Sequence, residues 1–130
     1  MPTLLFLCPH GAAKSVLAAA YFQRLAHQRG LAWQATCAGT EPDEAVSPMV
    51  RQVLETEGVK VPLSAPRHVT REELQTAAGI VSMGCDLGAL LPPGARVEQW
   101  DDVPPVSADL FAARAVIRAH LERLLDELAR

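Results

Sequence analysis

The fold is decided by residues 3–22, which read TLLFLCPHGAAKSVLAAAYF. The uninterrupted apolar run at 3–7 is typical of a parallel strand that is covered on both faces, and it ends just before Cys8. A Pro-His-Gly tripeptide then breaks the strand. We expect a helix over residues 16–28, which Ser15 can cap. This order of strand, short loop and helix is the beginning of an α/β domain.

The rest of the chain continues the alternation of strands and helices. The expected strands are residues 32–38, 79–83 and 96–100, and the expected helices are residues 48–57, a short helix opened by a capping box at 70–73, and residues 108–128. Residues 84–95 are expected to form a loop with one helical turn. The alternation indicates a three-layer α/β fold, a four-stranded parallel sheet with helices on both faces. We expect residues 1–130 to form a single domain, with its active site at the C-terminal ends of the strands.

Composition excludes several classes of function. With 130 residues, 49% of them apolar, the chain can bury a core without disulfides or metal. A net charge of -3 argues against a nucleic-acid-binding surface, which needs a basic face. No apolar stretch approaches the roughly 20 residues of a membrane span, and the N-terminal run is too short for a signal peptide. We therefore expect a cytoplasmic protein.

The three cysteines, Cys8, Cys37 and Cys85, are odd in number and widely spaced. In a reducing compartment such a set does not predict a disulfide framework. The chain has no Cys-x-x-Cys or His-x-x-x-His pair, so we expect neither a metal site nor a bound cofactor. Catalysis and plain core packing remain as roles for these thiols.

The loop at residues 8–15 carries the chemistry. Between a buried strand and a helix N-terminus, consecutive backbone N–H groups can form an anion-binding nest, to which the helix dipole adds positive charge. A thiolate at the base of that nest is stabilised, so Cys8 is expected to be the most acidic of the three thiols and to act as a nucleophile. Lys14 adds a full positive charge. The Ser15 hydroxyl can donate to the Cys8 sulfur or cap the helix, but not easily both.

From these residues outward, the chain resembles the low-molecular-weight protein tyrosine phosphatases and the thiol-coupled arsenate reductases that share their fold. Residues 8–15 are similar to the family pattern Cys-x5-Arg-Ser after a first strand, and residues 36–40, TCAGT, to its Ser-Ala-Gly-Thr segment. Residues 82–85, SMGC, resemble the segment that carries the second redox cysteine of arsenate reductases. Residues 100–105, WDDVPP, resemble the Trp-x-x-x-Asp-Pro loop. The resemblance implies a flavodoxin-like, low-molecular-weight phosphatase-like fold over nearly the whole chain.

The resemblance also implies the site residues. Cys8, Lys14, Ser15 and Cys85 are the expected catalytic residues. The expected oxyanion-binding residues are Pro9, His10, Gly11, Ala12, Ala13, Lys14 and Ser15.

The chain departs from the family pattern at four places. Lys14 replaces the arginine that holds a tetrahedral oxyanion with two parallel hydrogen bonds, which a lysine point charge cannot do. Gly11 replaces an asparagine, and both residues tolerate positive φ. Pro104 replaces the aspartate that protonates a phosphatase leaving group, and Asp101 or Asp102 is a candidate substitute. No third cysteine follows Cys85 within residues 86–92.

These departures weaken phosphatase chemistry more than arsenate reduction. The resemblance therefore implies an arsenate reductase, an oxidoreductase of arsenical resistance in which Cys85 or an external thiol releases arsenite. Its expected partners are an arsenate or phosphate oxyanion and a reductant, which is thioredoxin, a glutaredoxin-like protein or a low-molecular-weight thiol. A low-molecular-weight phosphatase and a non-catalytic oxyanion-binding module are the alternatives, and Cys85 could equally be a core residue.

Overall fold

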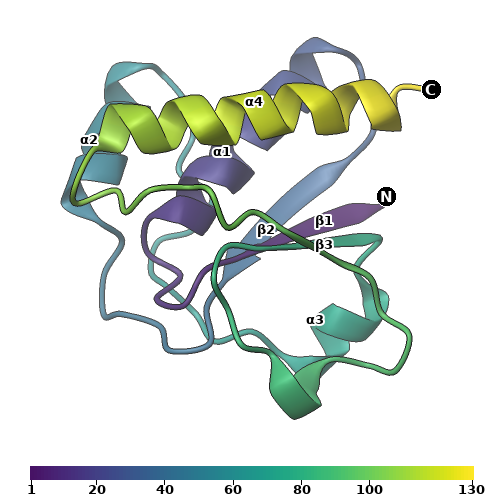
Figure 1. Ribbon diagram of the computed structural model, residues 1–130. Helices are drawn as coiled ribbons and strands as arrows, with labels where there is room; N and C mark the ends of the chain where they lie inside the picture. The colour runs from purple at the N-terminus through teal and green to yellow at the C-terminus, as the bar shows by residue number, and fades with distance from the viewer.

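The strands of the computed structural model, which describes residues 1–130, form one parallel four-stranded sheet in the order β2-β1-β3-β4 (Figure 1). Its elements are β1 (Thr3–Leu7), α1 (Lys14–Gln28), β2 (Gln34–Ala38), α2 (Pro48–Thr56), α3 (Arg71–Thr76), β3 (Gly79–Ser82), the 3₁₀ turn η1 (Gly88–Leu90), β4 (Val97–Gln99) and α4 (Leu110–Leu128). The expected α/β class, with its parallel sheet and flavodoxin-like alternation, is confirmed.

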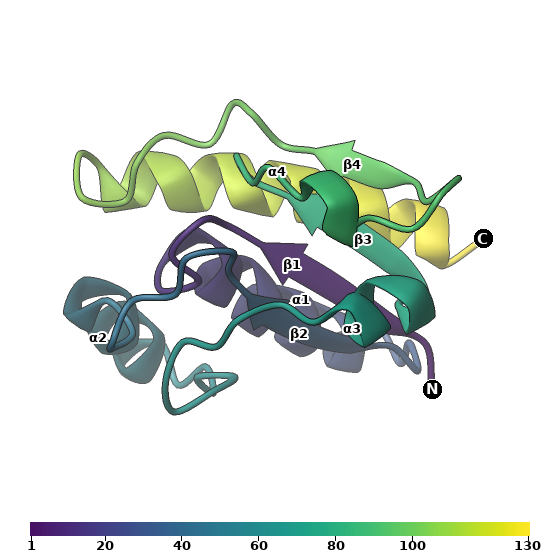
Figure 2. The ribbon, with the colours of Figure 1, turned by 90° about the horizontal axis from the view of Figure 1, so that it is seen from below.

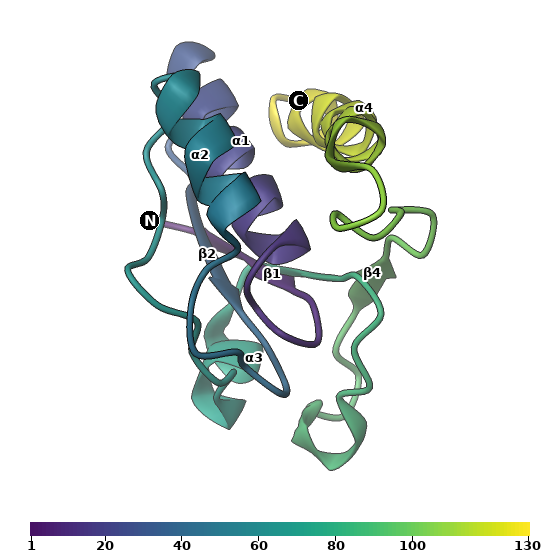
Figure 3. The same ribbon diagram turned by 90° about the vertical axis from the view of Figure 1, so that its left-hand side faces the viewer.

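Helices cover both faces of the sheet. Figures 2 and 3 show α1, α2 and α4 on one face, with α3 and the η1 turn on the other. Side chains of β1 alternate between the two: Leu4 and Phe6 belong to a cluster of 27 buried residues under α1 and α4, whereas Leu5 and Leu7 belong to a smaller cluster of 7 on the α3 face. The two clusters explain why β1 reads as a continuous apolar run.

Helix starts follow local capping chemistry. Ser47 caps α2 by accepting a hydrogen bond from the Val50 N–H at 3.4 Å, and the predicted capping box at residues 70–73 is present at the start of α3. The last helix begins at Leu110, two residues later than expected, because the Asp109 side chain accepts from the Ala112 N–H at 3.0 Å and sets the start there.

The start of α1 differs from the prediction for a reason that concerns the site. The helix begins at Lys14 rather than Val16, and its N-cap residue, Ala13, provides no side-chain hydrogen bond. Ser15 lies within the first turn, so it does not cap the helix. Its side chain is fully buried and free to serve another partner.

Strand pairing places the site at the middle of the sheet's C-terminal edge. Phe6 on β1 is in register with Cys37 on β2, and Leu7 is in register with Ser82 on β3. The residues that follow these strands are therefore neighbours at one edge, where ligands bind in open α/β sheets. No helix of the molecule is both long enough and apolar enough to cross a bilayer.

Candidate active site

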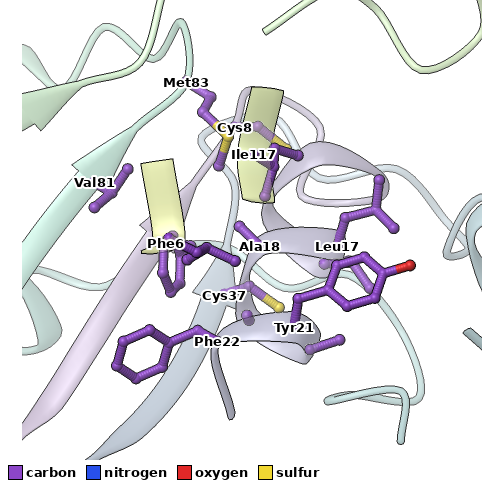
Figure 4. Close-up of a cluster of buried hydrophobic side chains, with 14 of the residues drawn as sticks. Phe6, Cys8, Leu17, Ala18, Tyr21, Phe22, Cys37, Val81, Met83 and Ile117 are labelled. Carbon is purple, nitrogen blue, oxygen red and sulfur yellow. The ribbon is translucent and has the colours of Figure 1, made fainter. Parts of the chain in front are cut away.

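Cys8 follows β1 directly and is almost completely buried at 4% exposure. Its Sγ lies 3.1 Å from the Ser15 Oγ and 3.4 Å from the Ser15 backbone N, which donates to it. The thiol form of Cys8 donates to the Ser15 hydroxyl, and an ionised sulfur would accept from the same group. Of the two roles open to Ser15, the structure assigns the contact with the Cys8 sulfur. Figure 4 shows Cys8 and Met83 close together, at the top of the buried cluster.

The backbone carbonyls of the Cys8 loop (residues 8–15) are bound from outside by a second segment, the outer loop (residues 41–47). Three main-chain hydrogen bonds join the two loops: Glu41 N to Pro9 O at 2.7 Å, Asp43 N to His10 O at 3.0 Å, and Ser47 N to Ala12 O at 2.9 Å. A further bond, Gly11 N to Cys8 O at 3.2 Å, closes a turn within the Cys8 loop. Main-chain hydrogen bonds thus fix much of the shape of the Cys8 loop.

This arrangement turns backbone N–H groups towards the inside of the loop. In a trans peptide the N–H points opposite to the preceding carbonyl, and the chain contains no cis peptide. The N–H groups of His10 and Ala13 therefore point away from the outer loop. No protein acceptor takes these two N–H groups, nor those of Ala12 and Lys14. Together with the N-terminus of α1 they are backbone donors available to an anion, and they form the candidate anion-binding nest.

Two glycines make the nest possible. Gly11 adopts φ +60°, and a Cβ there would lie 2.9 Å from the Gly39 N. A Cβ on Gly39, just beyond β2, would lie 2.7 Å from both Gly11 N and Pro9 O, and 2.9 Å from Cys8 O. Backbone meets backbone at this contact, so no side chain fits between them. Sequence reasoning missed this role of Gly39, although the glycine stands in the TCAGT motif.

Lys14 is the first residue of α1 and is half-buried. Its ammonium group makes no ion pair and no hydrogen bond with another side chain, so its charge is not neutralised by a carboxylate. A lysine ammonium can attract an oxyanion to the nest as a point charge, without the planar fork of an arginine.

Cys37 faces the same side of the sheet as Cys8 and is buried at 2% exposure. Burial raises the pKa of this thiol to about 12, although the nearby Arg67 lowers it; the charge of Cys8 and then that of Glu73 raise it further. A thiol in this environment stays protonated at neutral pH and is a poor nucleophile. The guanidinium of Arg67, a residue that the sequence could not assign, pairs with Glu73 at 2.5 and 2.6 Å.

Cys85 lies three residues beyond β3, where its backbone N donates to Ser82 Oγ at 3.1 Å. It is half-buried and packs against the smaller cluster on the α3 face, whereas Cys8 belongs to the larger cluster. Burial, and then the charge of Cys8, raise the pKa of Cys85, while hydrogen bonds from Thr40 and Ser82 lower it. Cys85 is therefore close enough to Cys8 to respond to its charge.

One of the two carboxylates proposed as substitute acids is held by a side chain of α4. Asp102 accepts a hydrogen bond from His120 Nε2 at 2.8 Å, and this bond lowers the pKa of Asp102. The His120 ring in turn stacks on buried Trp100, with ring centroids 4.5 Å apart. Asp101 is exposed, and neither aspartate caps α4, since Asp109 does so. A carboxyl group whose pKa is lowered is ionised at neutral pH and holds no proton to donate, which argues against Asp102 as the acid.

Sequence reasoning also missed two side chains that contact residues of the site. His120 is the first, because its contact with Asp102 joins residues 18 positions apart and no local spacing reveals it. Asp43 is the second: its Oδ1 lies 3.3 Å from His10 Nδ1, which also lies 3.2 Å from the Glu41 carbonyl oxygen. No three His, Cys, Asp or Glu side chains gather into a cluster that could hold a metal ion.

Comparison with known proteins gives matches to phosphatases and to arsenate reductases. The family model "Low molecular weight phosphotyrosine protein phosphatase" matches residues 3–99. The solved arsenate reductase of Archaeoglobus fulgidus is 30% identical, covers 98% of this chain and 99% of its own, and has a TM-score of 0.74. A Halobacterium salinarum protein provisionally named an arsenate reductase is 25% identical over 123 residues, which span 93% of this chain and 87% of that protein. A protein tyrosine phosphatase of Entamoeba histolytica superposes with a TM-score of 0.87 over 99% of this chain and 97% of its own, at 18% identity, a likeness of fold alone.

Proposed function

Because the chain belongs to the low molecular weight phosphotyrosine protein phosphatase family, we propose that it is a thiol-dependent arsenate reductase of arsenical resistance. Cys8 is the nucleophile, and Cys85 or an external thiol releases arsenite. The observation that supports this most is the direct pairing of β1 with β3. Adjacent strands lie about 4.8 Å apart, so the thiols that follow β1 and β3 start from neighbouring positions at one edge of the sheet.

In the first step, the Cys8 thiolate attacks the arsenic atom of an arsenate held in the nest. A sulfur–arsenic bond forms, one arsenic–oxygen bond breaks, and the departing oxygen accepts a proton and leaves as water. Arsenic remains in its pentavalent state. The N–H groups of the Cys8 loop and the Lys14 ammonium balance the negative charge of the arsenate oxygens.

In the second step, the Cys85 thiolate attacks the Cys8 sulfur. A disulfide forms, and the sulfur–arsenic bond breaks with its electron pair on arsenic, which is thereby reduced and leaves as protonated arsenite. Gly84 at φ +90° and Gly88 at φ +49° flank Cys85 and favour the movement that this attack needs. Thioredoxin, a glutaredoxin-like protein or a low-molecular-weight thiol then reduces the disulfide, which requires a reducing compartment such as the cytoplasm.

A phosphatase is the second candidate, because the matching family model is that of a phosphatase. Its chemistry needs strong stabilisation of the transferring phosphoryl group and an acid for the leaving group. Lys14 lacks the arginine fork, Pro104 stands where the acid is expected, and Asp102 is bound to His120. Losing one such group commonly costs about 10²-fold in rate, so we expect weak hydrolysis at most. A domain that only binds the oxyanion is the third reading.

One experiment separates these readings. The purified, reduced protein is given arsenate without external reductant, and the arsenite formed and the disulfide peptides are measured after one turnover. An arsenate reductase of the proposed kind forms about one arsenite per chain and a Cys8–Cys85 bridge. Cys37→Ala is the matched control and should behave as the unmodified protein does, whereas Cys8→Ser should form no arsenite.

Other outcomes either contradict the proposal or decide between its two routes of arsenite release. Fast hydrolysis of p-nitrophenyl phosphate without arsenite formation would identify a phosphatase. Tight arsenate binding with neither reaction would identify a binding module. Full steady-state activity of Cys85→Ala with a small thiol would show that the external thiol, and not Cys85, releases arsenite.

A further inference from the structure

Thr40 lies where two segments of the candidate site meet. It follows Gly39, at which a Cβ would lie 2.7 Å from the Pro9 carbonyl oxygen, and it precedes Glu41, whose N–H donates to the same oxygen at 2.7 Å. Both chain neighbours of Thr40 are therefore held against the Cys8 loop. The position of Thr40 beside this loop is fixed by backbone contacts.

The side chain of Thr40 points to the α3 face of the sheet. Ala38 on β2 belongs to the smaller buried cluster on that face. Strand pairing continues beyond Ala38, because Gly39 forms a parallel bridge with His68. Since side chains alternate along a strand, Thr40 points to the same face as Ala38. Cys85 packs against this cluster as well.

Cys85 forms hydrogen bonds with both the side chain and the backbone of Thr40. The two residues follow strands that are not neighbours, since Thr40 comes after β2, Cys85 comes after β3, and β1 lies between these strands. Their contact therefore spans the end of β1, where the chain enters the Cys8 loop. Ser82 Oγ holds the backbone N–H of Cys85 separately, at 3.1 Å.

We propose that Thr40 is a positioning residue, which holds the Cys85 thiol across the end of β1 and, by donating to its sulfur, favours the thiolate that attacks Cys8. This inference rests on the proposed function, in which Cys85 releases arsenite. A hydrogen bond donated to a sulfur stabilises its ionised form, and the thiolate is the attacking species in disulfide formation. Burial raises the pKa of Cys85, and the contacts with Thr40 offset part of that effect.

Alkylation of Cys85 tests this role without arsenate. Iodoacetamide reacts with the thiolate, so the rate at neutral pH follows the ionised fraction of the thiol. The Cys8→Ser protein serves as the parent, because this substitution removes the charge of Cys8, the charged group that acts on Cys85. Peptide mapping separates the reaction of Cys85 from that of Cys37.

Thr40→Val in this background keeps the shape of the side chain and removes its hydroxyl. We expect the alkylation of Cys85 at neutral pH to slow on the order of threefold to tenfold, the net worth of about one hydrogen bond. The pH profile of alkylation should move to higher pH. Thr40→Ser keeps a hydroxyl and should restore both the rate and the profile, which a purely structural role of the threonine would not predict.

Thr36→Val is the matched control. Thr36 lies on β2, four residues before Thr40, so alternation places it on the same face but away from the C-terminal edge of the sheet. This variant should alkylate Cys85 at the rate of the parent. Circular dichroism confirms that each variant is folded.

The inference and the proposed function fail in different experiments. Alkylation of Cys85 that is as fast in Thr40→Val as in the parent, or faster, overturns the role of Thr40 and leaves arsenate reduction untouched. If the unmodified protein forms no arsenite in the single turnover described above, the proposed function is overturned, and with it the role of Thr40 in the reaction.

Discussion

At the scale of single residues, backbone N–H groups of the Cys8 loop form the candidate nest, and the Lys14 side chain adds a positive charge. The Cys8 loop needs small residues and a positive-φ glycine to turn its N–H groups inward, and the sequence could predict this from loop composition and position. The role of Cys8 as the nucleophile of the loop stays a prediction from the sequence. The sequence could not predict which partner Ser15 takes, because capping and sulfur contact need the same hydroxyl and only the start of α1 decides between them.

Lys14 should dominate the electrostatic binding of oxyanions. Lys14→Ala is expected to weaken arsenate or phosphate binding by about tenfold to a hundredfold, the range for losing a charge-assisted contact. Lys14→Arg should retain binding and raise p-nitrophenyl phosphate hydrolysis, if the acid step does not limit the rate. Calorimetric titration measures the first effect. Lys60, the other lysine of the chain, is exposed, and Lys60→Ala is the control. Unchanged binding in Lys14→Ala would falsify this role.

Cys37 should be unreactive at neutral pH, although it lies beside the site. Its pKa of about 12 predicts that iodoacetamide modifies it far more slowly than a free thiol at pH 8. Because folding raises the pKa of Cys37, the unfolded chain ionises at a lower pH than the folded protein does. The free energy of unfolding is therefore unaffected below the ordinary pKa of a thiol and falls as the pH rises from there towards 12. Urea unfolding of Cys37→Ala should therefore show a smaller loss of unfolding free energy between pH 9 and 11. Equal losses of unfolding free energy in Cys37→Ala and in the unmodified protein would contradict the raised pKa of Cys37.

At the scale of elements, the alternation of strands and helices was predictable and the exact starts were less so. The capping box at residues 70–73 and the Ser47 cap are predicted correctly, since both are local patterns of side chains and backbone. The Asp109 cap is not, because residues 101–109 contain several residues able to cap a helix. The contact between the loop after β4 and α4 could not be predicted, since it depends on how the helix packs.

Asp102 and His120 fasten this loop to α4. Because the hydrogen bond from His120 lowers the pKa of Asp102, the ionised carboxylate stabilises the fold above its ordinary pKa, and that stability is lost as pH falls through the lowered value. Asp102→Asn should therefore lose less unfolding free energy than the unmodified protein as the pH is lowered from 5 to 2. Chemical unfolding at each pH measures this. Asp101→Asn, at the neighbouring exposed position, is the control. It should lose as much unfolding free energy between pH 5 and 2 as the unmodified protein does.

At the scale of the whole molecule, the parallel sheet brings distant segments to one edge. The order of strands and helices along the sequence predicts that β1 and β3 are neighbours, and the pairing of Leu7 with Ser82 confirms this. The sequence does not reveal that Cys8 and Cys85 pack against different faces of the sheet, because the turn of residues 83–85 departs from strand alternation. Nor does it reveal the outer loop, whose bonds to the Cys8 loop join backbone atoms and leave no side-chain pattern.

The Gly39 contact joins two of these distant segments and should be intolerant of any side chain. Gly39→Ala would place a methyl group within 2.7 Å of Gly11 N and Pro9 O, which are backbone atoms that cannot yield cheaply. We expect a loss of about 1–3 kcal/mol of unfolding free energy, together with loss of arsenate binding. Gly79→Ala is the control. A Cβ at this position would meet only the flexible Leu4 side chain, at 2.8 Å, and Gly79 lies at the end of β3 that is farther from the candidate site. Arsenate binding that survives in Gly39→Ala would contradict this account.

The outer loop has a consequence for how the protein can vary. It supports the Cys8 loop through the main-chain N–H groups of residues 41, 43 and 47, so the support is independent of which side chains stand there. A proline at any of these three positions removes a donor and is the one natural residue barred from all of them. Ordinary mutation of the outer loop can therefore change the surface around the Cys8 loop while these three main-chain hydrogen bonds remain.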